Sequence, residues 1–71
     1  GQGELVLVRS PDGALADALA TAFCNRLQGP NDVKAVLELA KRHVRHGLTG
    51  IFAQCRGAVG VWGDMELVAV E

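Results

Sequence analysis

The stretch QGPND, Gln28 to Asp32, divides the helical part of this sequence into two. Gly29 suits the left-handed conformation in which many helices end, and Pro30 cannot continue a helix that precedes it. Asn31 or Asp32 can then cap a new helix, because their side chains accept hydrogen bonds from its first free amide groups. The stretch therefore predicts two consecutive helices instead of one long helix.

Apolar residues at helical spacing lie on both sides of this stretch. Over residues 14–27, large apolar side chains recur four positions apart, as expected for an amphipathic helix that Ser10 caps, with Pro11 in its first turn. They are Leu15, Leu19, Phe23 and Leu27. Over residues 32–46, a second set marks one face of a helix that Gly47 closes. These residues are Val33, Val36, Leu37, Ala40 and Val44.

Strand-like segments flank the two helices. Leu5 to Val8 form an apolar run that predicts a strand covered on both faces, in the centre of its sheet. Downstream, GIFAQC, AVGVW and MELVAV are short and rich in β-formers, and Arg56-Gly57 and Gly63-Asp64 predict tight turns between them. The order β-α-α-β-β-β predicts an α+β fold, with two helices packed on one face of a small, mainly antiparallel four-stranded sheet.

Length and composition favour one compact domain over residues 1–71. Hydrophobic residues make up 49% of the chain and charged residues 21%, which is typical of a folded protein. The apolar faces of the predicted elements indicate one shared core. Its expected members are Leu5, Val6, Leu7, Val8, Leu19, Phe23, Leu37, Ala40 and Ile51. Because both ends of the chain lie directly beside predicted strands, we interpret the domain as excised or processed from a longer polypeptide.

Cysteine usage and hydropathy predict an intracellular, cytoplasmic protein. Cys24 and Cys55 match no metal-binding spacing, and Cys24 lies in an apolar helical stripe where a free thiol packs as a small hydrophobic group. We therefore expect no disulfide, no bound metal and no cofactor. No apolar run reaches the roughly 18 residues of a membrane span, so we also expect no membrane partner.

The segment KRHVRHGLTG, Lys41 to Gly50, concentrates basic residues and histidines. One interpretation is structural, because cations in the last turn of a helix interact favourably with its partial negative charge. The alternative is a nucleic-acid or phosphate-binding module that uses this end of the second helix, enlarged by Arg9, Arg26 and Arg56 if the fold brings them near. The formal net charge of −1 weighs against this alternative. The carboxyl end of a helix also presents carbonyl groups, and not N–H groups, to an anion.

Catalysis is a third hypothesis. A nucleophilic cysteine would need Cys24 or Cys55 beside His43 or His46. The acidic residues are scattered over turns and helix starts, and they form neither a carboxylate pair nor a metal-ligand pattern. We therefore assign no catalytic residue and favour a non-enzymatic function.

The main hypothesis is a small non-catalytic domain of a larger protein, which binds a protein partner or associates with itself. Trp62 lies beside a predicted turn, where an aromatic side chain can anchor an interface. A short antiparallel sheet also offers an edge strand for pairing with another chain. Across the main and alternative hypotheses, the candidate binding residues are Lys41, Arg42, Arg45, His46, Arg56 and Trp62.

Overall fold

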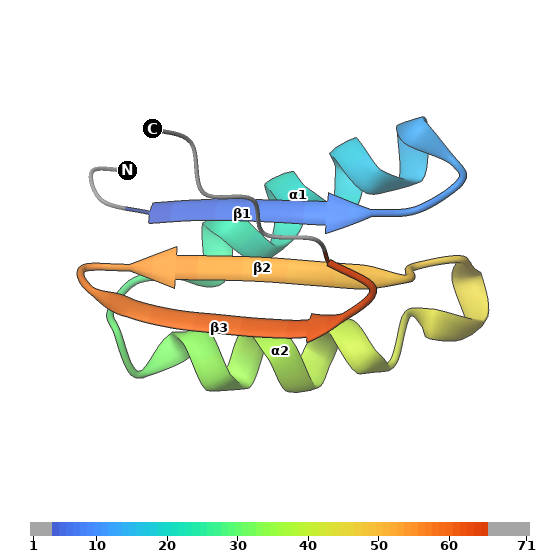
Figure 1. Cartoon of the computed structure of the whole chain (residues 1–71). Coiled ribbons are helices and arrows are strands. Elements are labelled where there is room, and N and C mark those ends of the chain that lie inside the picture. The colour runs from blue at the N-terminus through green and yellow to red at the C-terminus, as the bar shows by residue number, and fades with distance from the viewer. Residues whose placement is uncertain (1–3, 66–71) are drawn as a thin grey trace, which may run out of the picture.

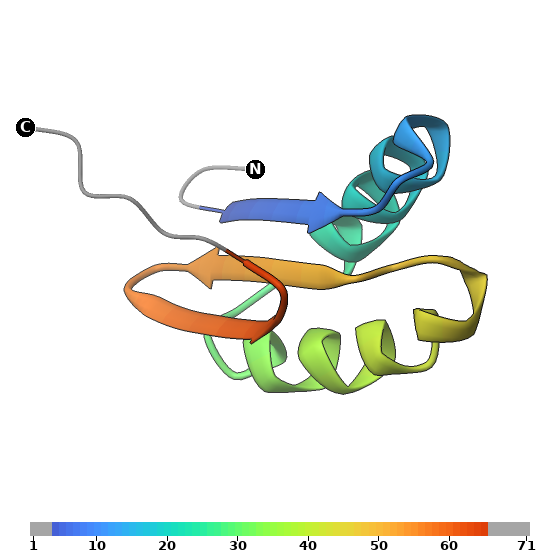
Figure 2. The ribbon, with the colours of Figure 1, turned by 45° about the vertical axis from the view of Figure 1, so that its right-hand side comes forward.

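A computed structural model describes residues 4–65 as a layer of helices packed on a β-sheet (Figure 1). The elements are, in chain order, β1 (Glu4–Arg9), α1 (Gly13–Arg26), α2 (Asp32–Lys41), the 3-10 helix η1 (Val44–His46), β2 (Gly50–Cys55) and β3 (Ala58–Gly63). α1 packs against β1, and α2 packs against β2 and β3, so both helices lie on the same side of the sheet (Figure 2).

The prediction of a four-stranded sheet is wrong. Residues 4–65 form a three-stranded antiparallel sheet in the order β1-β2-β3. The sequence pattern predicts the fourth strand over MELVAV, residues 65–70. Met65 belongs to no strand, and residues 66–71 lie outside the described part of the chain. The fold class is still α+β.

The central strand is β2, and not β1 as the apolar run of β1 predicts. Val6 points towards the helices and is buried, whereas Leu5 and Leu7 are exposed on the opposite face of the sheet. The prediction that residues 5–8 are covered on both faces is therefore wrong. Its physical reason is that both helices pack on one side, and within residues 4–65 no second layer covers the other side.

The hydrophobic core lies between the helices and the sheet. Its buried members are Val6, Leu19, Phe23, Leu27, Val33, Val36, Ala40, Leu48, Ile51, Ala53 and Cys55. Five of the predicted core residues belong to it, namely Val6, Leu19, Phe23, Ala40 and Ile51. Val8 and Leu37 are only partly buried against this core, and Leu5 and Leu7 lie outside it.

The junction between α1 and α2 is held by an aspartate, and not by a left-handed glycine. Gly29 has no positive φ angle, because the chain leaves α1 in an extended conformation at Leu27. The Asp32 carboxylate instead accepts hydrogen bonds from the backbone N–H groups of Gln28 and Gly29, at 3.0 and 3.1 Å. These contacts satisfy two amide groups that would otherwise be free between the helices.

Asp12, and not Ser10, caps α1. The Asp12 carboxylate accepts a hydrogen bond from the N–H group of Leu15 at 3.2 Å, which satisfies one free amide group of the first turn. Ser10 Oγ instead accepts a hydrogen bond from the N–H group of Asp12 at 3.1 Å. Pro11 therefore precedes the helix and does not lie in its first turn.

The tight turn predicted at Arg56-Gly57 is present between β2 and β3. Both residues have positive φ angles, +49° for Arg56 and +88° for Gly57. Two successive positive φ angles characterise the type I′ turn, whose twist matches that of the two strands it joins. Arg56 is thereby placed at the tip of the hairpin, beyond the end of β2.

Candidate functional site

The sequence predicts one continuous helix over residues 32–46, but in the structure this helix is interrupted within the basic segment. α2 ends at Lys41, and residues 44–46 form the separate 3-10 helix η1. The N–H group of His43 bonds to the carbonyl of Ala40, three residues earlier, so the helix tightens here and loses its regular ladder. Gly47 then turns the chain with a φ of +110°, the left-handed conformation that its position predicts.

Gly47→Ala is expected to lower the free energy of unfolding by about 1–2 kcal/mol, because the new residue must keep a left-handed backbone. An added β-carbon would lie 3.5 Å from Ser10 Oγ and 3.7 Å from Leu15 Cδ2, which is ordinary contact, so the loss is conformational. Chemical denaturation measures it. Gly29→Ala is the matched control, because Gly29 has no positive φ and open space around it. Equal losses at the two positions would contradict this explanation.

Three basic side chains of this segment lie together. A surface hollow of about 510 Å³ is lined by Lys41, Arg42, Val44 and Arg45. Lys41 already has two neighbours: its Nζ lies 2.9 Å from Glu38 Oε2 and 6.0 Å from the centre of the Trp62 ring. The hydrogen bond and positive charge of Lys41 lower the pKa of the Glu38 carboxyl below its usual value. Part of the positive charge around the hollow is therefore already balanced.

The other candidate residues, His46, Arg56 and Trp62, do not line this hollow. His46 turns towards His43, with their Nδ1 atoms 3.4 Å apart, and the His43 ring packs against the edge of Phe23. Arg56 lies in the β2–β3 turn, separated from Lys41 by the length of a six-residue strand, roughly 20 Å. Trp62 is partly buried and packs against the core, so it contributes to packing beneath Lys41.

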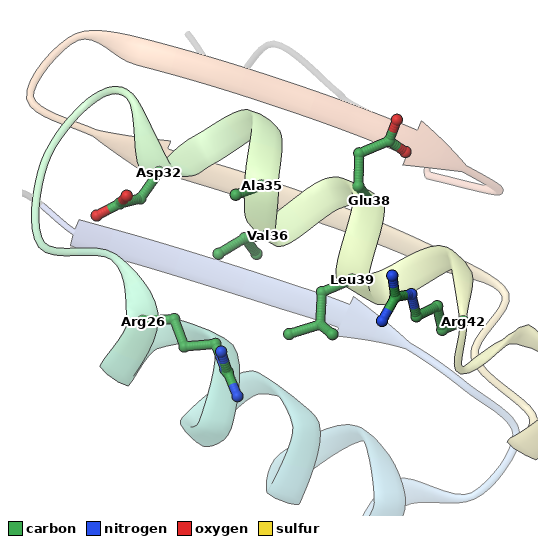
Figure 3. A pocket seen from close by; sticks show the side chains of 7 residues that line it. All are labelled: Arg26, Asp32, Ala35, Val36, Glu38, Leu39 and Arg42. Carbon is green, nitrogen blue, oxygen red and sulfur yellow. The ribbon is translucent and has the colours of Figure 1, made fainter.

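A second hollow, of about 390 Å³, lies between α1 and α2 (Figure 3). Arg26 extends into it from α1 and Arg42 from the end of α2, with Leu39 between them. Arg26 and Arg42 therefore line the same hollow, but Arg26 does not line the hollow formed by Lys41, Arg42 and Arg45. Asp32 and Glu38 also line this hollow, so two carboxylates balance the charge of its two cations.

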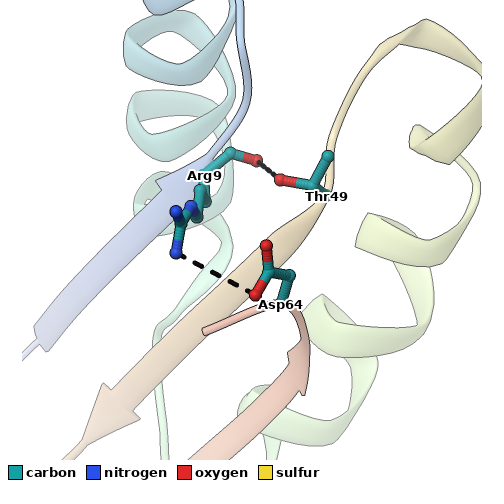
Figure 4. Close-up of polar contacts among 3 residues, drawn as sticks. All are labelled: Arg9, Thr49 and Asp64. Carbon is teal, nitrogen blue, oxygen red and sulfur yellow. Dashed lines mark hydrogen bonds and ion pairs between the residues drawn. The ribbon is translucent and has the colours of Figure 1, made fainter. Parts of the chain in front are cut away.

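Polar contacts join all three strands at one end of the sheet (Figure 4). The carbonyl oxygen of Arg9 accepts hydrogen bonds from the N–H group and the hydroxyl of Thr49, at 2.8 and 3.0 Å. The N–H group of Asp64 donates to the Thr49 carbonyl at 2.8 Å, and the Asp64 carboxylate lies 4.0 Å from the Arg9 guanidinium. Both charges are exposed, so this ion pair adds little stability. The backbone contacts instead determine the path of the chain after β3.

Cys55 and His46 are not assembled as a nucleophilic site requires. Cys55 is completely buried at the end of β2, whereas His46 precedes the other end of that strand. A reactive thiolate needs an exposed, electropositive setting, so Cys55 belongs to the core instead. Among residues 4–65, no three histidine, cysteine, aspartate or glutamate side chains gather to hold a metal ion.

The sheet face turned away from the helices, here called the open face, is apolar and exposed. Figure 1 looks onto this face. Two rows cross it, Leu5-Gln54-Val59 and Leu7-Phe52-Val61, and neither contains a charged residue. The four edge-strand side chains of these two rows have exposed fractions of 45% (Leu5), 48% (Leu7), 56% (Val59) and 42% (Val61), and the charged Arg9 follows them on the same face of β1. Phe52 lies between them on β2 and is half-buried.

The sequence contains one signal for the open face that a search for binding motifs misses. In β3, small residues alternate with valines: Ala58 and Gly60 face the helices, and Val59 and Val61 face away. A β-carbon at Gly60 would collide with Leu37, so the small side is the one on which α2 packs. The two valines of β3 are thereby left on the uncovered side, while Trp62 lies on the helix side.

Within residues 4–65, neither α-helix is long and apolar enough to cross a membrane.

Comparison with known proteins gives a partial match. No known protein-family model matches the chain. The chain is similar to a UPF0280 protein of Methanoculleus marisnigri, with 42% identity over 65 residues that cover 92% of this chain and 25% of the relative. It thus spans about a quarter of the length of the curated relative it matches, and that relative's name states no activity.

Proposed function

We propose that this chain is a non-catalytic protein-interaction domain of a larger cytoplasmic protein, and that the open face is its binding surface. The observation that supports this proposal is the set of four edge-strand side chains exposed by 42–56% around Phe52. Contiguous apolar patches of a few hundred Å² on a folded protein frequently mark an interaction site. The absence of charge in the two rows favours an apolar protein surface as the partner.

The energetics of the open face predict a modest affinity. Burying the exposed half of one leucine or valine side chain contributes about 1 kcal/mol. Five such side chains therefore supply roughly 5 kcal/mol, part of which offsets the loss of rotational and translational freedom on association. Tight binding would require the partner to contact the flanks of the sheet as well.

Leu7→Glu is expected to lower the fluorescence of the apolar probe ANS bound to the folded chain several-fold, because it places a carboxylate in an apolar row. Thr21→Glu is the matched control, since it adds the same charge on the exposed side of α1. Near-ultraviolet circular dichroism verifies that both variants are folded. If Leu7→Glu and the unmodified chain bind ANS equally, the open face is not the accessible apolar surface and the proposal fails.

The second candidate is a nucleic-acid or phosphate-binding module, which the hollow lined by Lys41, Arg42 and Arg45 supports. This module would lose heparin affinity in Arg42→Ala and Arg45→Ala, and its binding would weaken steeply with salt. We expect neither loss of heparin affinity nor steep salt dependence. We also expect each substitution to change the stability by only a few tenths of a kcal/mol, because both side chains are exposed. A tenfold loss of heparin affinity in either variant would favour the module over the interaction domain.

A further inference from the structure

We propose that residues 66–70, here called the strap, cover the row Leu7-Phe52-Val61 of the open face until a binding partner displaces them. The strap would cross the face as a second layer and would not add a strand to the sheet. This inference rests on the proposed function, because it concerns access to that binding surface. The strap follows directly on Met65, the last residue that the structure describes.

The chain after β3 already covers one corner of the open face. Gly50 of β2 faces this side of the sheet, two residues along the strand from Phe52, and yet it is buried. A β-carbon at Gly50 would lie 2.5 Å from the carbonyl oxygen of Asp64 and 2.9 Å from Met65 Cγ. Asp64 and Met65 therefore lie over the sheet on its open side.

Polar contacts hold this path across the sheet. The N–H group of Asp64 donates to the Thr49 carbonyl at 2.8 Å, and the N–H group of Met65 donates to the Gly63 carbonyl at 3.0 Å. The Asp64 carboxylate lies 4.0 Å from the Arg9 guanidinium, so the chain crosses β2 in the direction of β1 (Figure 4). The strap is thus attached above the sheet, and not beyond its edge.

The sequence of the strap fits one row of the open face. Leu67 to Val70 reads LVAV, four apolar residues in succession. Four extended residues span roughly 13 Å, and the outer strands of a three-stranded sheet lie roughly 10 Å apart. The row Leu7-Phe52-Val61 is the one nearest to Gly50, roughly 7 Å along the strands, which two extended residues can bridge. The strap is therefore long enough to cover this row.

The charges agree with the same placement. Among the open-face residues of β1, β2 and β3, Arg9 alone is charged, and its guanidinium is exposed. Glu66, the first residue of the strap, directly follows Met65. A carboxylate at this point complements the Arg9 guanidinium, while the apolar residues after it complement the apolar row.

The strap would make the open face a regulated surface. The strap and a protein partner would bury the same row, so they would compete for it. The apparent affinity for the partner would then fall in proportion to the fraction of chains whose strap is displaced. The partner would gain access to both rows only in those chains.

Methyl NMR of the whole 71-residue chain tests the placement of the strap. We expect nuclear Overhauser contacts from the methyl groups of Leu67, Val68 or Val70 to those of Leu7 or Val61. A sample that mixes isotope-labelled and unlabelled chains identifies any contact between two copies. The contacts should occur within one copy and should persist on dilution.

ANS binding tests whether the strap limits access. The double substitution Leu67→Asp with Val68→Asp places two carboxylates in the strap, which opposes its burial on an apolar row. We expect ANS fluorescence to rise at least twofold, and to fall again when Leu7→Glu is added. Thr21→Asp with Asn25→Asp is the matched control, because it adds the same charge at exposed positions of α1 and should have no effect.

Two results would overturn the strap. One is the absence of methyl contacts within a copy, including the case in which contacts join only different copies. The other is unchanged ANS binding after the two strap substitutions. If Leu7→Glu still lowers ANS binding in either case, the strap is refuted and the proposed function is retained. Conversely, methyl contacts together with ANS binding that ignores Leu7→Glu in the strap variant would refute the proposed function alone.

Discussion

Phe23→Ala is expected to remove a large part of the stability of the fold. Phe23 is 1% exposed and is among the largest of the completely buried side chains, and its ring packs edge-on against His43. Removing a buried phenylalanine side chain costs about 3–5 kcal/mol, because the transfer free energy is lost and a cavity remains. A domain of this size has a total stability of about 4–10 kcal/mol. Circular dichroism during urea unfolding gives the loss directly.

Leu5→Ala is the matched control for Phe23→Ala. It also removes a large apolar side chain, but Leu5 lies on the open face and is 45% exposed. At low concentration, where copies do not associate, Leu5→Ala should change the stability by less than about 1 kcal/mol. A Leu5→Ala variant as unstable as Phe23→Ala would show that the face assignment of β1 is incorrect.

Gly63→Ala is expected to destabilise the fold by about 2–4 kcal/mol, through two separate effects. Gly63 has a φ of +80°, a conformation that residues with a β-carbon rarely adopt. A β-carbon there would also collide with the carbonyl oxygen of Thr49 and lie 3.0 Å from the α-carbon of Gly50. Both neighbours are backbone atoms, so no side chain can rotate to make room. The midpoint of thermal or urea unfolding measures the combined effect.

Gly57→Ala separates the two effects of Gly63→Ala. Gly57 has a similar φ of +88°, but nothing lies within 4 Å of the position where its β-carbon would be. Gly57→Ala should therefore show only the conformational loss, about 1–2 kcal/mol. Equal losses at the two glycines would mean that the chain after β3 moves aside easily. In that case the contacts between Asp64 and Thr49 would not hold its path.

Local signals in the sequence predict that two helices are present and that β2 and β3 are joined by a tight turn, but they predict helix ends and tertiary contacts less well. Pro30 separates the two helices, and Gly47 and Arg56-Gly57 reverse the chain, because these effects depend on few neighbouring residues. The exposure of the open face, in contrast, depends on tertiary contacts. The run from Leu5 to Val8 is apolar on both sides of the strand, and only the position of the helices determines which side is covered.

The candidate binding residues divide in the same way. Lys41, Arg42 and Arg45 lie close together because they are close in sequence, although a helix end and a separate short helix hold them where the sequence predicts one continuous helix. Whether Arg56 and Trp62 join them depends on strand order and on which side of β3 faces the helices. The hairpin places Arg56 at the far end of the sheet, and the alternation of β3 places Trp62 on the helix side.

The pairing of β1 with β2 has a consequence for the order of folding. β2 and β3 are joined by a two-residue turn, so their hairpin forms from contacts that are close in sequence. β1 pairs with β2 only across both helices, with Arg9 opposite Gly50 and Glu4 opposite Cys55. Closing so long a loop is entropically unfavourable and slows folding. We expect β1 to dock last, from a transient state in which both edges of the β2–β3 hairpin are open and vulnerable to aggregation.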